Sequence, residues 1–348
     1  MDIGRRHLMA LSGSLALAGL VGTATPAFSQ SSSTTKIKPP RLKKGDTVGL
    51  VSPASKSLER FEYQISEEVV TALGLVPKRG QYVGKDFGYL AAQDKERAAD
   101  VNAMFADKSV KAIMAVRGGW GCARILPYLD YDMIRANPKP LIGYSDITAL
   151  HLALQAKTGL VSFHGPNAAS AWGERTLEYF KPLLFDGAQP TFKNPVLKDG
   201  RLVQRKWRTQ TITGGKARGH LIGGNLTVMT ALVGTPYMPN TDGGILFLED
   251  IDEAEYRIDR MLTQLGLAGL LSGLKGVVFG QCTSCKSSGG SGFELADVLE
   301  QHFKPLGVPA FHGAFFGHMS DQFTIPVGIE AEIDSDTGTV RLLEAAVI

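Results

Sequence analysis

The chain contains few of the residues from which several common kinds of site are built. Its 348 residues include only 3 cysteines, which are too few for the disulfide framework of a small secreted scaffold. Lysine and arginine total 37 against 34 aspartates and glutamates. This near balance leaves no large positive surplus for phosphate backbones, so nucleic acid is not an expected partner.

Motifs typical of nucleotide and metal sites are also missing. The sequence has no G-x-G-x-x-G or G-x-x-x-x-G-K-[ST] string and no H-E-x-x-H pair, so we expect neither a cofactor nor a metal. Hydrophobic residues make up 44% and charged residues 20%, which is ordinary for a globular protein. At about 100–200 residues per domain, the length predicts two domains.

The N-terminus reads as a targeting segment. The paired Arg5 and Arg6 precede an apolar run at residues 8–21, and residues 27–29 (AFS) resemble a cleavage site. We predict a twin-arginine signal peptide over residues 1–29 and a flexible Ser/Thr-rich leader over 30–42. The alternatives are Sec export, a retained anchor, or a first helix of the domain. The expected location is periplasmic or secreted, and no later apolar run reaches the roughly 20 residues that would span a membrane after signal removal.

The mature chain shows the alternation of an α/β fold. Short apolar runs alternate with helical patterns in the first half, which predicts a parallel sheet covered on both faces. The expected strands are 46–52, 111–116, 140–144 and 161–163, and the expected helices are 58–73, 94–105 and 147–156.

The second half has a similar alternation and ends in a hairpin. Strands are expected at 244–248, 276–280, 329–333 and 340–343, with a helix at about 254–265, and the connection before them carries one helix near 177–184. The predicted organisation is an N-terminal domain at 43–165, a connection at 166–206 and a C-terminal domain at 207–348.

The string GYSD at residues 143–146 is the strongest candidate for a nucleophile. An apolar strand runs into Gly-x-Ser and a helix starts at once, which is the geometry of a nucleophile elbow. Ser145 would then be the nucleophile, and the backbone N–H of Asp146 would face a developing oxyanion. The alternative is that Ser145 only caps the helix.

Glycines follow the buried strand that ends at residue 116. Gly118 and Gly119 in RGGWG allow a ligand to approach closely at the carboxyl end of a parallel strand. They are candidate oxyanion donors and substrate contacts. The alternative is a plain tight turn.

A serine nucleophile needs a base and a group that orients the base. Four histidines stand beside glycine near expected strand ends, and their positions do not choose among them: His164, His220, His312 and His318. Four carboxylates follow the expected strand at 244–248: Glu249, Asp250, Asp252 and Glu253. One of them could orient the base, and the alternative is a solvated acidic loop. A lone C-x-x-C at Cys282 and Cys285 precedes a Ser/Gly-rich loop, which does not favour a redox motif.

Several strings together resemble the LD-carboxypeptidase family of serine peptidases, which also includes microcin-immunity hydrolases. The resemblance covers about residues 43–348. The strings that carry it are, in order, GDTVGLVSPAS, VRGGWG, LIGYSDITAL, SFHGP, GHLIGGNL, ILFLEDIDEAEYRIDRML and FGHMSDQFTIPVG.

The resemblance implies the roles that spacing leaves open. Ser145 matches the family's nucleophile, His318 its general base and Glu249 the acid that orients the histidine. It implies a flavodoxin-like N-terminal α/β sandwich, a C-terminal α/β domain with a small β-barrel-like core, and often a homodimer. The implied reaction releases D-alanine from peptidoglycan tetrapeptide stems through an acyl-enzyme, with a muropeptide as substrate.

Three other functions remain open at this point. The immunity branch cleaves a peptide–nucleotide-like toxin, and Trp172 stands where an aromatic residue of that branch would stack on the base; packing in the domain core is the alternative. An exported two-lobed protein could also bind muropeptides without cleaving them. The last is a metallopeptidase, which no ligand spacing supports.

Overall fold

The first half of the chain and one strand from residues 325–327, inside the predicted C-terminal domain, form a six-stranded sheet. The computed structural model describes residues 35–196, 202–285 and 292–348. The strand order is β12-β5-β4-β3-β1-β2, and the five parallel strands follow the 2-1-3-4-5 order of flavodoxin-like folds, which confirms that expectation. The strands are β1 (Thr47–Val51), β2 (Val76–Arg79), β3 (Val110–Ala115), β4 (Leu141–Gly143), β5 (Ser162–His164) and β12 (Ile325–Val327).

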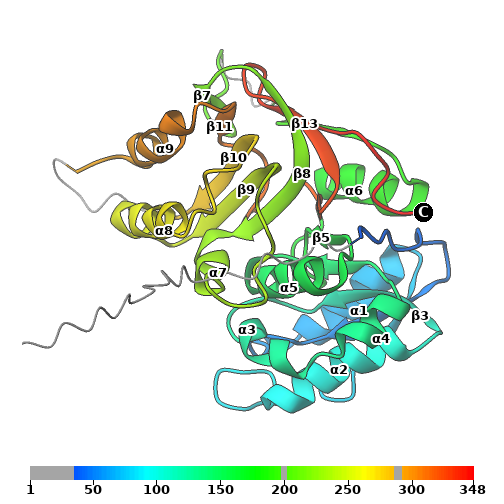
Figure 1. Cartoon of the computed structure of the whole chain (residues 1–348). Helices are drawn as coiled ribbons and strands as arrows, with labels where there is room; N and C mark the ends of the chain where they lie inside the picture. Colours follow the sequence, from blue (N-terminus) through cyan, green and yellow to red (C-terminus); the bar gives the residue numbers. More distant parts are fainter. Residues whose placement is uncertain (1–34, 197–201, 286–291) are drawn as a thin grey trace, which may run out of the picture. The chain divides into compact units, whose positions relative to one another are not determined.

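Helices cover both faces of this sheet (Figure 1). Met104 of α2 and Leu150 of α5 share a core with Ile113, whereas Val70 of α1 and Phe180 of α6 share a second core with Met114. Neighbouring strand residues point to opposite faces, which is why the unbroken apolar runs are buried on both sides. The elements are α1 (Glu62–Ala72), α2 (Asp94–Ala106), α3 (Cys122–Ile125), η1 (Leu126–Tyr128), α4 (Tyr131–Ala136), η2 (Ser145–Ile147), α5 (Thr148–Thr158), α6 (Glu174–Lys181) and the π-helical turn η3 (Pro182–Asp186).

The second half contains an eight-stranded mixed sheet in the order β6-β14-β13-β8-β9-β10-β11-β7. Strands β8 to β11 are parallel, and the outer strands pair antiparallel. In the part of the chain that is described, no pairing joins β6 to β7, so the barrel-like core is an open sheet. The strands are β6 (Thr191–Lys193), β7 (Gln210–Thr213), β8 (Lys216–Asn225), β9 (Gly244–Ile251), β10 (Gly276–Thr283), β11 (Ala310–His312), β13 (Glu330–Asp334) and β14 (Thr339–Leu342).

Three helices pack on this sheet, and their core is continuous with that of α2 and α5. Ile258 and Leu299 lie in the same apolar cluster as Leu150. Helix α5 is therefore covered on almost every side, which explains its apolar sequence TALHLALQAKT. The Thr148 hydroxyl accepts a hydrogen bond from the N–H of Asn225 (2.9 Å), which ties the first turn of α5 to β8. The helices are α7 (Leu226–Ala231), α8 (Glu255–Leu267) and α9 (Leu295–Phe303), and the 3₁₀ turn η4 (Lys304–Leu306) follows.

The described end of the predicted leader is part of the fold. Ile37 pairs with the chain at Leu160, and the N–H of Leu42 donates to the Leu184 carbonyl (2.9 Å). Residues 37–42 are thus held in place, unlike the flexible leader predicted from composition. The predicted signal peptide lies outside the described residues. Within the described ranges, no helix is long and apolar enough to cross a membrane.

Candidate functional site

The chain turns sharply at Ser145, between β4 and α5. Ser145 has φ 65°, a left-handed conformation that is strained for a residue other than glycine. The helix begins within the same turn, so the hydroxyl stands at the carboxyl end of the sheet with a helix N-terminus behind it. This is the geometry expected of a nucleophile elbow.

Three predicted side chains meet at this turn. His318 Nε2 lies 2.9 Å from Ser145 Oγ, and His318 Nδ1 lies 2.7 Å from Glu249 Oε2. Glu249 is on β9, and His318 is in the segment between β11 and β12. The second sheet thus supplies the carboxylate, the first sheet supplies the hydroxyl, and the connection from β11 of the second sheet to β12 of the first supplies the imidazole.

The surroundings of the histidine keep its partner carboxylate ionised. Glu249 is fully buried, which opposes its charge, but the His318 imidazole outweighs burial and lowers the pKa of the Glu249 carboxyl. Burial also opposes a charge on His318, yet the Glu249 carboxylate raises the pKa of this imidazole above its ordinary value. Each group therefore stabilises the charged form of the other.

The neighbouring acids have other partners. Asp250 Oδ2 accepts hydrogen bonds from the N–H (3.0 Å) and hydroxyl (2.8 Å) of Thr227, at the start of α7. Burial raises the pKa of Asp250 to about 6. Glu253 lies 3.7 Å from Arg257 on the exposed side of α8. Of the acids in this loop, Glu249 is the one placed against His318.

The other candidate histidines do not contact the Ser145 hydroxyl, although His164 lies near enough for the charges of Glu249 and His318 to act on it. His164 is fully buried in β5, His220 lies in β8, and His312 is in β11. His151, inside α5, binds the Ser162 hydroxyl and the Gly143 carbonyl at 2.8 Å each, and burial lowers its pKa to about 3. It is a neutral core residue that joins α5 to β4 and β5.

The glycine turn after β3 lies directly against Ser145. A Cβ at Gly118 would be 2.9 Å from the Cβ of Ser145, so a larger residue does not fit there. Gly119 has φ 107°, and a Cβ there would lie 2.4 Å from the Ser55 hydroxyl. The N–H of Asp146 belongs to the first turn of the helix, where backbone donors have no intrahelical acceptor. Gly118 and the N–H of Asp146 are thus close to the hydroxyl, Gly119 lies against Ser55, and the oxyanion role of all three stays a prediction.

The Asp146 side chain connects the two turns. Its Oδ2 accepts a hydrogen bond from the N–H of Cys122 (2.7 Å), and the residue is 1% exposed. The buried guanidinium of Arg97 donates to the carbonyls of Pro53 and Gly121 beside it. These groups hold the glycine turn in place. Sequence reasoning missed Arg97 because it lies in a charged helical stretch typical of a solvated surface.

Asp146 gives a pH-dependent stability prediction. Burial raises its pKa to about 6, whereas an Asp in an unfolded chain titrates near 3.9. Between these values the folded protein binds more protons, so the contribution of this group to stability falls as pH rises from about 4 to about 6. Asp146→Asn removes this titration and keeps an oxygen acceptor. The free energy of unfolding is measured in urea for both proteins. From pH 4 to pH 7, the difference between the Asn variant and wild type should shift by about 2–3 kcal/mol in favour of the variant. Equal pH slopes would contradict this prediction.

Two further sequence features have structural partners. Trp172 donates its indole N–H to the Asn167 carbonyl (3.1 Å) and packs edge-on against Phe180, with ring centroids 4.8 Å apart. Trp172 thus packs inside the domain, which was the alternative to stacking on a nucleotide base. Cys282 and Cys285 form a disulfide at the end of β10, and the Ser/Gly-rich residues 286–291 that follow lie outside the described residues.

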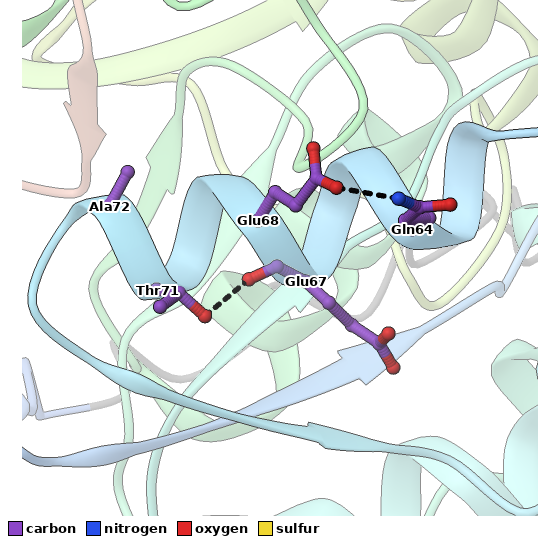
Figure 2. Close-up of a pocket in the computed structure, with 5 residues that line it drawn as sticks. All are labelled: Gln64, Glu67, Glu68, Thr71 and Ala72. Carbon is purple, nitrogen blue, oxygen red and sulfur yellow. Dashed lines mark hydrogen bonds between the residues drawn. The ribbon is translucent and has the colours of Figure 1, made fainter.

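A hollow on α1 contains none of these residues. Figure 2 shows its lining, in which the Gln64 amide donates to Glu68 (2.7 Å) and the Thr71 hydroxyl donates to the Glu67 carbonyl (2.8 Å). The Glu67 carboxylate forms an ion pair with Arg79 of β2 (2.8 Å), so the polar groups of this hollow pair with one another and with the neighbouring strand. Nothing in this arrangement points to a ligand.

Comparison with known proteins identifies the family of this chain. Models of the LD-carboxypeptidase N-terminal and C-terminal domains match residues 48–165 and 218–333. The probable murein peptide carboxypeptidase of Bacillus subtilis is 39% identical over 324 residues, which cover 89% of this chain and 95% of the relative. The chain belongs to the LD-carboxypeptidase family. It is accordingly a serine-type carboxypeptidase, a hydrolase.

Other LD-carboxypeptidase relatives carry two different names. The crystal structure of a muramoyltetrapeptide carboxypeptidase from Oxalobacter formigenes superposes with a TM-score of 0.72 at 30% identity, covering 85% of this chain and 97% of that one. The microcin C7 self-immunity protein MccF of Escherichia coli is 29% identical over 328 residues, covering 86% and 94%. The two-domain α/β architecture is shared with both branches.

Proposed function

We propose that this LD-carboxypeptidase hydrolyses the L,D peptide bond that holds the terminal D-alanine of peptidoglycan tetrapeptide stems. The observation that carries the proposal is the chain of contacts from Ser145 Oγ through His318 to Glu249. Relatives named for murein peptides and muramoyltetrapeptide support this substrate class.

The reaction follows from the positions of these groups. His318 Nε2 takes the proton of the Ser145 hydroxyl while Oγ attacks the carbonyl carbon on the L side of the bond. The N–H of Asp146 and one of Gly118 or Gly119 would donate to the resulting oxyanion. As the C–N bond breaks, the proton passes from His318 to the departing D-alanine amine. Water, deprotonated by the same imidazole, then cleaves the acyl ester and regenerates Ser145.

We further propose that the protein is exported and acts in the periplasm or outside the cell. The paired Arg5 and Arg6, the apolar run after them and the small-x-small string at 27–29 support a twin-arginine signal. An exported enzyme would meet its substrate at the cell wall. N-terminal sequencing of protein recovered from the periplasm tests this location, and finding the full-length chain in the cytoplasm contradicts it.

The similarity to MccF gives a second candidate function, hydrolysis of an aminoacyl-nucleotide analogue. The test is release of free D-alanine from purified disaccharide tetrapeptide by the mature protein, with Ser145→Ala as control and chelator present. We expect release by wild type only. Cleavage of the nucleotide analogue without D-alanine release would favour the immunity-type reaction. Tight muropeptide binding without turnover would favour a binding protein.

A further inference from the structure

Three exposed aromatic side chains lie on two turns next to the candidate site. Phe87, Tyr89 and Trp120, here called the aromatic rim, are 51%, 61% and 46% exposed. Other rings of the described chain are equally exposed, so the distinguishing feature of these three is that they lie on turns joined to one another beside Ser145. Their neighbours along the chain, Leu90 and Gly121, are buried, so the turns that carry the rings are anchored in the fold.

The two turns are bonded to the same pair of residues after β1. The Ser55 hydroxyl accepts a hydrogen bond from the N–H of Trp120 (2.9 Å), and the N–H of Lys56 donates to the Tyr89 carbonyl (3.2 Å). Phe87 and Leu90 also bond to each other through their backbones at 3.0 Å. The segments after β1 and β3 leave the sheet at its carboxyl edge, as Ser145 does after β4.

Trp120 of the rim lies within a short stretch of chain from the nucleophile. Gly118 is packed against Ser145, and Trp120 is two residues further on, which is at most about 7 Å of chain. In a muropeptide, the sugar is joined to the stem three residues before the bond to the terminal D-alanine, which is more than about 10 Å in an extended chain because the D-glutamate is linked through its side-chain carboxyl. A stem with its scissile carbonyl at Ser145 can therefore place its sugar beside the rim.

A charged pair beside the rings suits the polar side of a sugar. Lys56, in the segment after β1, and Asp86, next to Phe87, form an ion pair (2.9 Å), and their side chains are 36% and 63% exposed. An amino sugar has apolar C–H faces, which pack on aromatic rings, and hydroxyl and amide groups, which bond to charged side chains.

We propose that the aromatic rim and the Lys56–Asp86 pair form a subsite for the amino-sugar portion of a muropeptide. This inference rests on the proposed function and extends it to the part of the substrate that is not cleaved. Binding energy from such a remote group raises kcat/KM for the sugar-bearing substrate above that for the free peptide.

The test compares two substrates in each protein. D-Alanine release is measured from the disaccharide tetrapeptide and from the free tetrapeptide, for wild type, Tyr89→Ala and Trp120→Ala. We expect wild type to prefer the disaccharide substrate, and each substitution to lower this ratio of kcat/KM values by about tenfold, the usual effect of removing one well-placed aromatic contact. The matched control is Tyr128→Ala, because Tyr128 is 45% exposed and lies at η1, outside the rim. It should leave the ratio unchanged.

The ratio separates a sugar contact from damage to catalysis, because damage lowers both rates together. An unchanged ratio in both rim variants overturns the subsite. If the rim variants change their oligomeric state in sedimentation and keep the ratio, the rim is a contact with a second copy of the chain and the subsite is overturned. If wild type cleaves neither compound, the proposed function fails. Calorimetric binding of both compounds to Ser145→Ala then decides the subsite, and equal affinities overturn it.

Discussion

Ser145→Ala should lower kcat for D-alanine release by about four to six orders of magnitude, and His318→Ala should do nearly the same. The hydroxyl supplies the atom that attacks, and the imidazole 2.9 Å away takes its proton, so neither works without the other. Both variants should retain substrate binding, because neither group fills a large part of the site.

The double variant distinguishes a shared mechanism from two separate contributions. If Ser145 and His318 act as one unit, the double variant is hardly slower than either single variant. Losses that multiply would contradict the shared step. Circular dichroism and thermal unfolding of all three variants serve as controls, so that a loss of activity is not confused with a loss of fold.

The fold was predictable from the sequence where buried elements appear as unbroken apolar runs. The apolar runs at 111–116 and 140–144 correspond to β3 and β4, because parallel strands covered on both faces need no polar alternation. Helix α2 was equally visible. Its first turn is fixed by a reciprocal contact in which the N–H of Gln93 donates to the Glu96 side chain (3.1 Å).

Other elements were missed because tertiary contacts determine them. Strand β8 contains three glycines, which weaken any strand signal. Gly223 has φ 142°, and a Cβ there would lie 1.8 Å from the Phe247 carbonyl oxygen, so close approach of β9 requires glycine. Helix α1 begins at Glu62, later than the expected 58, because the Ser57 hydroxyl donates to the Glu59 carbonyl instead of capping the helix.

The candidate site was predictable only in part for the same reason. The turn at Ser145 follows from adjacent residues, since a strand, a small loop and a helix are contiguous in sequence. The partners come from β9 and from the segment after β11, 104 and 173 residues away. Four histidines had similar local sequence, and only the packing of the two sheets places His318, and not His164, against the hydroxyl. The resemblance to the family supplied that choice.

Glu249→Gln should lower kcat by about 10³- to 10⁴-fold and move the acid limb of the pH profile. In wild type the base must be neutral to accept the Ser145 proton, so kcat/KM falls as pH drops through the pKa of His318 in the free enzyme. Glu249 raises this pKa above the ordinary value of about 6.5, so the midpoint of the acid limb should lie above that pH.

In the Gln variant the attraction of the carboxylate is lost while burial remains, so the pKa of His318 should fall and the acid limb should shift to lower pH. The amide can also donate to Nδ1, which selects the tautomer whose Nε2 carries a proton and cannot accept one from Ser145. Asp250→Asn is the matched control, because it alters the adjacent buried acid, which bonds to Thr227 and not to His318. We expect it to reduce stability, to shift the acid limb much less and to leave most of kcat. If Asp250→Asn instead shows the larger loss of kcat and the larger pH shift, Asp250 and not Glu249 orients the base.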